Sequence, residues 1–256
     1  MKNHKVVQIT DTHLFESPDV SRYGVNSWRT LQAVVADVAA NHPDFDAVLL
    51  TGDLSQDETP GSYELLKEAL APLRTAPFYA IPGNHDNLEY MRSRLEESDF
   101  FVFRDAHLDG WRVAMLNSQV PGQVHGELGA AQIDRLAASL RGADEHVIVA
   151  MHHPPVAIDS AWLDRLRCLD GEQLLAVLTN PPVKAVVCGH VHQNFEGKAG
   201  GIPILTTPST CAQFTPAVPK FDVEAAAAPG YRVFELERDG RWSSSVCRVT
   251  VGAPGT

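Results

Sequence analysis

Five short apolar runs in this chain each end in a cluster of aspartate, asparagine or histidine, and this repeated arrangement restricts the possible folds more than any other feature. The clusters are Asp11-Thr12-His13, Gly52-Asp53, Gly83-Asn84-His85-Asp86, His152-His153-Pro154 and Gly189-His190-Val191-His192. The runs before them, such as VVQIT, AVLLT and KAVVC, have the length and the β-branched residues of buried strands. Ligands collect beyond the carboxyl ends of strands in α/β sheets, so we expect the five loops to converge on one site.

Helix-like stretches alternate with the strand-like runs. Strands are predicted at residues 5–10, 47–51, 78–81, 112–116, 146–151, 185–188 and 202–206, and helices at residues 27–40, 62–73, 130–140 and 172–178. Near the end of the chain, residues 231–236 and 244–249 flank Asp239-Gly240, which is a hairpin signal. This order predicts a layered α/β domain with a strand-rich second sheet.

Length and composition fit a single domain over residues 1–256. The apolar fraction of 44% and the charged fraction of 21% are ordinary for a globular protein. No internal repeat or long linker divides the chain. No apolar run approaches the roughly 18 residues of a membrane helix, and the first residues are too polar for a signal peptide. These features predict a cytoplasmic protein that does not bind a membrane.

Charge and cysteine spacing exclude several other classes of protein. The four cysteines stand far apart without a C-x-x-C pair, which favours core thiols over a disulfide framework or a zinc knuckle. The formal net charge of −11 argues against a nucleic-acid partner, because phosphate contacts need a basic surface. A small anionic substrate stays compatible with this charge, since bound cations would supply local positive charge.

The residue types in the five clusters suit hard or borderline divalent metals, which prefer carboxylate, imidazole and amide ligands. In an extended chain, the Asp-x-His and His-x-His pairs would each place both side chains on one side. Asp53 has two carboxylate oxygens and is the natural candidate to bridge two ions. The glycines before Asp53, Asn84 and His190 permit tight turns and close approach of a substrate.

Each cluster taken alone also has an ordinary structural explanation. An isolated Asp-x-His is usually a surface loop, Gly-Asp is common turn chemistry, and paired histidines can simply pack in a core. A purely structural origin of the whole set would need five independent coincidences. Six of the eleven histidines lie in these clusters, which composition alone does not predict. A shared metal site is therefore the favoured interpretation.

The series D-T-H, G-D, G-N-H-D, H-H-P and G-H-V-H resembles the calcineurin-like metallophosphoesterase superfamily over residues 11–192. Within it, the chain is similar to the bacterial class III cyclic nucleotide phosphodiesterases of the CpdA/Icc type. The supporting stretches are TDTHLF, TGDLSQD, IPGNHD, CGHVHQ, TPSTCAQFTP and PGYRVFEL, and the resemblance extends over roughly residues 5–250. The resemblance implies an α/β four-layer sandwich, with two mixed β-sheets flanked by helices.

The resemblance also implies roles for individual residues. One ion would be held by Asp11, His13 and His192, the other by Asn84, His152 and His190, with Asp53 bridging both. His85 would face the substrate, to stabilise phosphoryl charge or to protonate the leaving oxygen. The cofactors would be two divalent or mixed-valence ions of manganese, iron, zinc or cobalt, and the sequence does not choose among them.

Two further residues are expected next to the ligands. Asp86 would orient a neighbouring imidazole or act as the N-cap of a helix over residues 88–95, or both. His153 would be a positioned residue beside the metal centre rather than a ligand. Leu14, Phe15 and Phe214 are candidates to stack on a purine, although apolar residues more often serve packing alone.

The implied function is the hydrolysis of 3′,5′-cyclic nucleotides, chiefly cyclic AMP, to the 5′-monophosphate. A broader phosphodiesterase, such as a glycerophosphodiesterase, would share the same fold and site. A non-catalytic metal-dependent interaction scaffold is the alternative of another class, and the complete ligand set argues against it. The predicted partner is a small phosphodiester, and the C-terminal strands leave a homodimer open.

Overall fold

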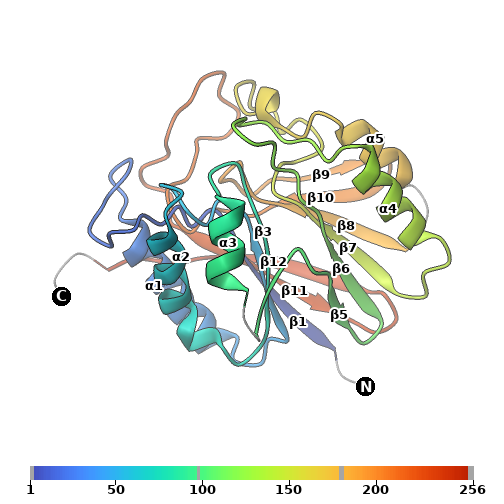
Figure 1. Ribbon diagram of the computed structural model, residues 1–256, viewed down its shortest axis with the longest axis horizontal. Helices are drawn as coiled ribbons and strands as arrows, with labels where there is room; N and C mark the ends of the chain where they lie inside the picture. The colour runs from blue at the N-terminus through green and yellow to red at the C-terminus, as the bar shows by residue number, and fades with distance from the viewer. Residues whose placement is uncertain (1–2, 97–98, 179–181, 253–256) are drawn as a thin grey trace.

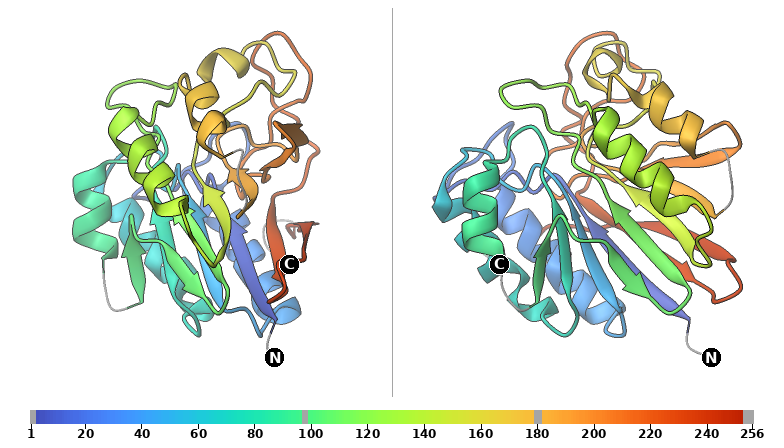
Figure 2. Two further views of the ribbon diagram at one scale, coloured as in Figure 1. Left: turned by 90° about the vertical axis from the view of Figure 1, so that its right-hand side faces the viewer. Right: turned by 45° about the vertical axis from the view of Figure 1, so that its right-hand side comes forward.

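Two mixed sheets of six strands each form the centre of the fold, and helices cover both outer faces (Figure 1). The computed structural model describes residues 3–96, 99–178 and 182–252. Figure 2 shows helices α4 and α5 on one side of the paired sheets and α1, α2 and α3 on the other. The fold class is therefore the four-layer α/β sandwich that the sequence motifs imply.

The first sheet has the strand order β12-β11-β1-β2-β3-β4. Its strands are β1 (His4–Ile9), β2 (Ala47–Thr51), β3 (Phe78–Ile81), β4 (Phe100–Val102), β11 (Gly230–Leu236) and β12 (Trp242–Arg248). Strands β1 to β4 run parallel, and the hairpin β11-β12 joins antiparallel to β1. The predicted C-terminal hairpin is confirmed, and it extends the first sheet because β11 pairs with the edge of β1.

The second sheet has the order β5-β6-β7-β8-β10-β9. Its strands are β5 (Ala106–Leu108), β6 (Trp111–Met115), β7 (His146–Ala150), β8 (Val183–Cys188), β9 (Glu196–Ala199) and β10 (Ile202–Thr206). The four central strands are parallel, while β5 and β9 close the two edges in antiparallel pairing. Each of the five clusters therefore follows a parallel strand.

The helices bury one face, and α1, α2 and α3 begin at a side-chain cap. They are α1 (Ser27–Asn41), α2 (Pro60–Leu70), α3 (Leu88–Leu95), α4 (Ala130–Leu140) and α5 (Gly171–Val177), with 3-10 turns η1 (Ala71–Leu73) and η2 (Asp164–Leu166). The Asn26 side chain accepts the Arg29 N–H at the start of α1, and Thr59 caps α2. Among the described residues, no helix is long and apolar enough to span a membrane.

Alternating side chains of each central strand supply two apolar layers. In β2, Val48 and Leu50 pack against the helices of the first sheet, whereas Ala47 and Leu49 lie between the two sheets. The fully buried Trp111 belongs to this inter-sheet layer, and its indole N–H donates to the Glu237 carbonyl at 2.8 Å. The inter-sheet layer fixes both sheets relative to each other, so loops from either sheet can share one site.

Candidate metal centre

Backbone hydrogen bonds join the loops that carry the five clusters. The Asp11 N–H donates to the Gly52 carbonyl and the His13 N–H to the Asp53 carbonyl, both at 2.9 Å. Across the two sheets, the His190 N–H lies 3.0 Å from both carboxylate oxygens of Asp11. These contacts lie at the edge where the parallel strands of both sheets end, and six predicted ligands form groups with facing ligand atoms there: Asp11, His13, Asp53, His152, His190 and His192.

Asp11, His13 and His192 form one buried group with facing ligand atoms. The Nε2 atoms of His13 and His192 lie 3.0 Å apart, and His192 Nε2 lies 3.3 Å from Asp11 Oδ1. Three potential ligand atoms around one small volume are the arrangement expected of a cation site.

His152 and His190 lie in a second buried group together with His153. The free atoms of these two predicted ligands and of Asn84 test whether a metal fits. Asn84 Oδ1, His152 Nε2 and His190 Nε2 are all buried, and within the described part of the chain none has a hydrogen-bond partner. Orphaned buried polar atoms are rare in native proteins and call for a missing partner. These are the atoms a metal would use, so the residues fit the implied ion.

Asp53 lies between the two groups. Its Oδ2 is 3.7 Å from His13 Nε2 and 3.4 Å from His152 Nε2. Its Oδ1 accepts the backbone N–H of His85 at 2.8 Å, which fixes the plane of the carboxylate. One carboxylate therefore faces a member of each group, as a bridging ligand must.

Carbonyl oxygens select the tautomer of two imidazoles. His192 Nδ1 lies 2.7 Å from the Ala212 carbonyl, and His152 Nδ1 lies 2.8 Å from the Thr51 carbonyl. A carbonyl only accepts, so each Nδ1 carries a proton, and the neutral form of each ring has its lone pair at Nε2. This contact to a backbone carbonyl is the usual support of a metal-ligating histidine.

Burial dominates the ionisation of the imidazoles. It lowers the pKa of His13 and of His190 to about 3, so both rings are neutral, which is their metal-ligating form. Burial also opposes the charged form of His152, but the Asp53 carboxylate outweighs it and raises the His152 pKa to about 9. Burial likewise opposes ionised Asp53, yet His152 holds the Asp53 pKa well below its usual range.

Left-handed backbone conformations occur at five of the seven predicted ligands. The φ angles are 53° at Asp11, 45° at His13, 51° at Asp53, 70° at His190 and 50° at His192. The expectation of extended Asp-x-His and His-x-His segments is therefore wrong. Each strand ends before its cluster, and the tight turn that follows aims the side chains inward. Such conformations are uncommon outside glycine and gather at functional sites.

Glycine is required next to these ligands for lack of space. A Cβ atom on Gly83 would overlap the Asp53 carboxylate and backbone, and one on Gly189 would overlap the side chains of Thr10 and Asp11. The close approach that the structure shows is between the loops themselves, and the expected close approach of a substrate stays a prediction.

His85 lies half-buried at the edge of the centre. Its ring centroid is 5.2 Å from that of His13, and its Nδ1 lies 3.2 Å from the side-chain nitrogen of Gln56. Since that amide nitrogen is a donor, His85 Nδ1 accepts and the remaining ring proton is on Nε2. His85 thus has a donor available for a bound anion.

Asp86 holds two loops together instead of contacting an imidazole. Its carboxylate accepts the backbone N–H groups of Leu54, Ser55 and Gly83 at 2.9–3.2 Å, and the Tyr63 hydroxyl at 3.0 Å. The expectation that Asp86 orients an imidazole is therefore wrong. Its four donors instead fix the loops that follow β2 and β3, which carry Asp53 and Asn84.

The predicted N-cap at Asp86 is also wrong by one position. The Asn87 side chain accepts the Tyr90 N–H at 3.1 Å and caps α3, while the Asp86 carboxylate is turned into the protein.

His153 uses both ring nitrogens within the protein. Nδ1 lies 2.8 Å from the Ser118 hydroxyl, and Nε2 lies 3.1 Å from the Val124 carbonyl. Its ring is 4.5 Å from that of His190, so it packs against a predicted ligand. With Nε2 donating and Nδ1 accepting, no lone pair is left for a metal. This placement matches a positioning role beside the centre.

Gln119 is a supporting residue that the sequence does not single out. Its side-chain nitrogen donates to the Gly83 carbonyl at 2.9 Å and to the Asp86 carbonyl at 2.5 Å. Gln119 follows the apolar strand β6. The signal that marked the five clusters, a polar residue after an apolar strand, was therefore present at Gln119 too. Gln132 braces the same segment through two hydrogen bonds to the Asn117 backbone.

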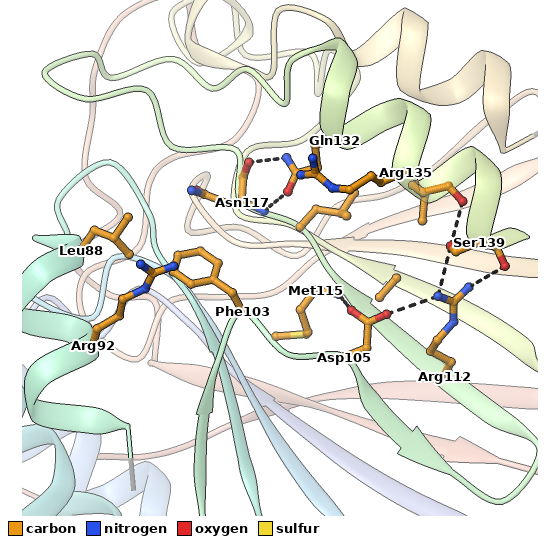
Figure 3. Close-up of a pocket in the computed structure, with 13 residues that line it drawn as sticks. Leu88, Arg92, Phe103, Asp105, Arg112, Met115, Asn117, Gln132, Arg135 and Ser139 are labelled. Atoms are coloured by element: carbon orange, nitrogen blue, oxygen red, sulfur yellow. Dashed lines mark hydrogen bonds and ion pairs between the residues drawn. The ribbon is translucent and has the colours of Figure 1, made fainter.

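A cleft of about 460 Å³ lies next to the segment that follows β6, between α3 and α4 (Figure 3). Its walls include Arg92, Phe103, Arg112 and Gln132, and none of the seven predicted ligands lines it. The cleft is separate from the metal centre.

The stacking candidates are placed differently from one another. Leu14 is buried in the core behind the first sheet, so it serves packing. Phe214 stacks on the His192 ring, with 4.1 Å between centroids and 8° between planes. Phe15 is half-buried after the first cluster.

Residues 4–194 match the family model described as calcineurin-like phosphoesterase. A 3′,5′-cyclic adenosine monophosphate phosphodiesterase CpdA from Vibrio vulnificus (strain CMCP6) is 38% identical over 97% of this chain and 91% of its own length. The corresponding CpdA from Escherichia coli (strain K12) is 37% identical, over 96% of this chain and 90% of its own.

The architecture also resembles that of a dimetal phosphatase from Danio rerio. The TM-score is 0.65 at 15% sequence identity, and the match covers 96% of this chain and 99% of the other. At this identity the likeness concerns the fold alone.

Proposed function

The chain belongs to the calcineurin-like phosphoesterase family, and from this premise we propose that it hydrolyses 3′,5′-cyclic nucleotides, chiefly cyclic AMP, to the 5′-monophosphate. The two CpdA relatives support the substrate, since they are cyclic AMP phosphodiesterases by name and align over nearly the whole chain. The observation that carries the chemistry is the set of orphaned ligand atoms on Asn84, His152 and His190.

The proposed ligands divide between two ions. Asp11, His13 and His192 would hold one, Asn84, His152 and His190 the other, and Asp53 would contact both. When bound, the two metal ions would lower the pKa of a water molecule and stabilise the charge on the phosphoryl oxygens. Manganese, iron, zinc and cobalt all suit this nitrogen and oxygen ligand set.

His85 is the proposed catalytic residue outside the ligand set. In the reaction, a water oxygen bonds to phosphorus, the P–O3′ bond breaks and the leaving 3′-oxygen gains a proton. Gln56 fixes the His85 ring through Nδ1. The proton on His85 Nε2 is therefore available to a phosphoryl oxygen or to the leaving oxygen. Gln56 is then a positioning residue for His85.

The test is a hydrolysis assay on metal-reconstituted protein with cyclic AMP, cyclic GMP, a glycerophosphodiester and bis(p-nitrophenyl) phosphate. A kcat/KM preference for cyclic AMP supports the proposal. Turnover of the glycerophosphodiester with little cyclic AMP hydrolysis would replace it by the broader phosphodiesterase. Bound metal without any turnover would favour the interaction scaffold.

Three further expectations stay predictions from the sequence. They are the homodimer that the C-terminal strands leave open, a cytoplasmic location and the absence of a nucleic-acid partner. The net charge of −11 is the argument for that absence.

A further inference from the structure

A continuous series of aromatic rings leads from the metal centre to the surface. Phe214 stacks on His192, and Phe221 follows with a centroid 5.4 Å from that of Phe214. Tyr23 completes the series, 5.3 Å from Phe221. Trp162 packs edge-on against both phenylalanines, at 5.2 and 5.3 Å. The series begins on a proposed metal ligand and ends in solvent.

The outer two rings are exposed although they contact each other. The exposed fraction is 44% for Tyr23 and 47% for Phe221. Arg22 lies over the Tyr23 ring at 4.9 Å and donates to its hydroxyl at 3.0 Å, which adds a cation to this rim. In an acidic protein, an exposed aromatic pair beside a cation suits a ligand that is both flat and anionic.

The loop that carries Phe221 is held in place at its base. Phe214 and Val223 form an antiparallel bridge. Inside it, the Thr215 N–H donates to the Asp222 carbonyl at 3.1 Å, and the Thr215 hydroxyl donates to the Asp222 carboxylate at 2.5 Å. The closed loop keeps Phe221 beside Phe214, so the rim is built into the fold.

Trp162 adds a second kind of evidence. Its indole N–H is buried, and among the described residues it has no acceptor. A buried donor without a partner is unfavourable, and it marks a place where a ligand can supply the acceptor. Ring nitrogens of a nucleobase are acceptors of this kind.

We propose that Phe221 and Tyr23, backed by Trp162, form the platform on which the nucleobase of the substrate stacks while its phosphate lies at the metal centre. This inference rests on the proposed function and adds the base-binding subsite to it. Stacking alone does not distinguish one base from another, since every base has an aromatic face. The platform therefore favours nucleotides over base-free diesters.

The experiment compares two inhibitors of the metal-reconstituted enzyme, 5′-AMP and ribose 5-phosphate, which differ only in the base. Bis(p-nitrophenyl) phosphate is the substrate for this comparison, so the result does not depend on cyclic AMP turnover. In the wild type, 5′-AMP should inhibit at a lower concentration than ribose 5-phosphate. In Phe221→Ala, the inhibition constant of 5′-AMP should rise at least about fivefold, with that of ribose 5-phosphate unchanged.

Two further variants separate stacking from folding. Phe221→Trp keeps an aromatic face and should retain the preference for 5′-AMP. Tyr90→Ala removes an aromatic ring that is 36% exposed on α3 and should change neither inhibition constant. An unchanged 5′-AMP constant in Phe221→Ala, or an equal loss for both inhibitors, would overturn the inference. If Phe221→Ala changes the oligomeric state but keeps the preference for 5′-AMP, the inference is also overturned, and Phe221 would instead contact another copy of the chain.

The two proposals fail in different ways. Inhibition that depends on the base and on Phe221, without hydrolysis of cyclic AMP, would refute the proposed substrate and keep the platform. Hydrolysis of cyclic AMP with equal inhibition by both compounds would refute the platform alone.

Discussion

The backbone N–H of His190 donates to the carboxylate of Asp11, 3.0 Å from each oxygen, and joins the end of β8 in one sheet to the end of β1 in the other. The two residues are 179 positions apart in the chain. Asp11, a proposed ligand of one ion, is thus oriented by the backbone of His190, a proposed ligand of the other ion. The centre is complete only when both sheets have packed together.

Asp53→Ala should remove bound metal and lower kcat by more than about 100-fold, since even residues that merely support ligands typically account for 10–100-fold. The reason is that Asp53 faces both ligand groups. Metal content by mass spectrometry and kcat on cyclic AMP measure the effect. Asp109→Ala, which changes an exposed carboxylate, is the control. Full activity with both ions bound would refute the bridging role.

His85→Ala should keep the metal and lower kcat by about 10²–10⁴-fold, the usual contribution of a positioned acid or base. Gln56→Ala should lower kcat less, because it removes only the hydrogen bond that orients the ring. Metal content and pH–rate profiles of both variants check this. If His85→Ala loses metal, the residue belongs to the ligand set.

Asp86→Ala should destabilise the fold by about 3 kcal/mol or more, because it leaves buried donors from Leu54, Ser55 and Gly83 unpaired. Tyr63→Phe removes one donor to the same carboxylate and should be milder, about 1 kcal/mol. Urea unfolding at equal metal saturation measures both. Equal stability of Asp86→Ala and the wild type would show that the loops are held by other contacts.

Removal of metal by a chelator should lower the melting temperature and abolish activity, and added manganese should restore both. Ions that bind only the folded state stabilise it by mass action, about 2.7 kcal/mol at 100 times Kd. Differential scanning fluorimetry with and without chelator measures the shift. In Asn84→Ala the shift should shrink, since one ligand of the second group is lost. A shift of the same size in Asn84→Ala would argue that Asn84 is not a ligand.

The strands and helices that carry strong periodicity were predictable from the sequence. Strands β2 and β3 and helix α4 occupy the expected residues. Strands β4 and β5 were missed because three residues give too short a pattern to recognise, and β9 was missed because its sequence EGKA has no apolar run. Which sheet β11 joins depends on which sheet has an unpaired edge strand. No local sequence pattern shows this.

The sequence predicted that the residues of the candidate metal centre would lie together, but it did not predict the residues that support them. Asp86 was expected beside an imidazole because its neighbours in sequence are metal-site residues, whereas its contacts come from Leu54 and Tyr63. Gln119 follows its strand as the ligands do, but no motif marks it. Contacts between loops far apart in sequence decide both roles.

The left-handed turns at the centre also limit how these positions can vary over evolutionary time. If Asp11 and Asp53 hold the ions as proposed, a replacement there must keep an oxygen ligand and must also tolerate a positive φ. Asparagine and aspartate accept that conformation more readily than other side chains, while β-branched residues do not. Glutamate would keep the charge but lose this backbone tolerance. Among replacements at these two sites, asparagine should therefore be the one that the fold tolerates best.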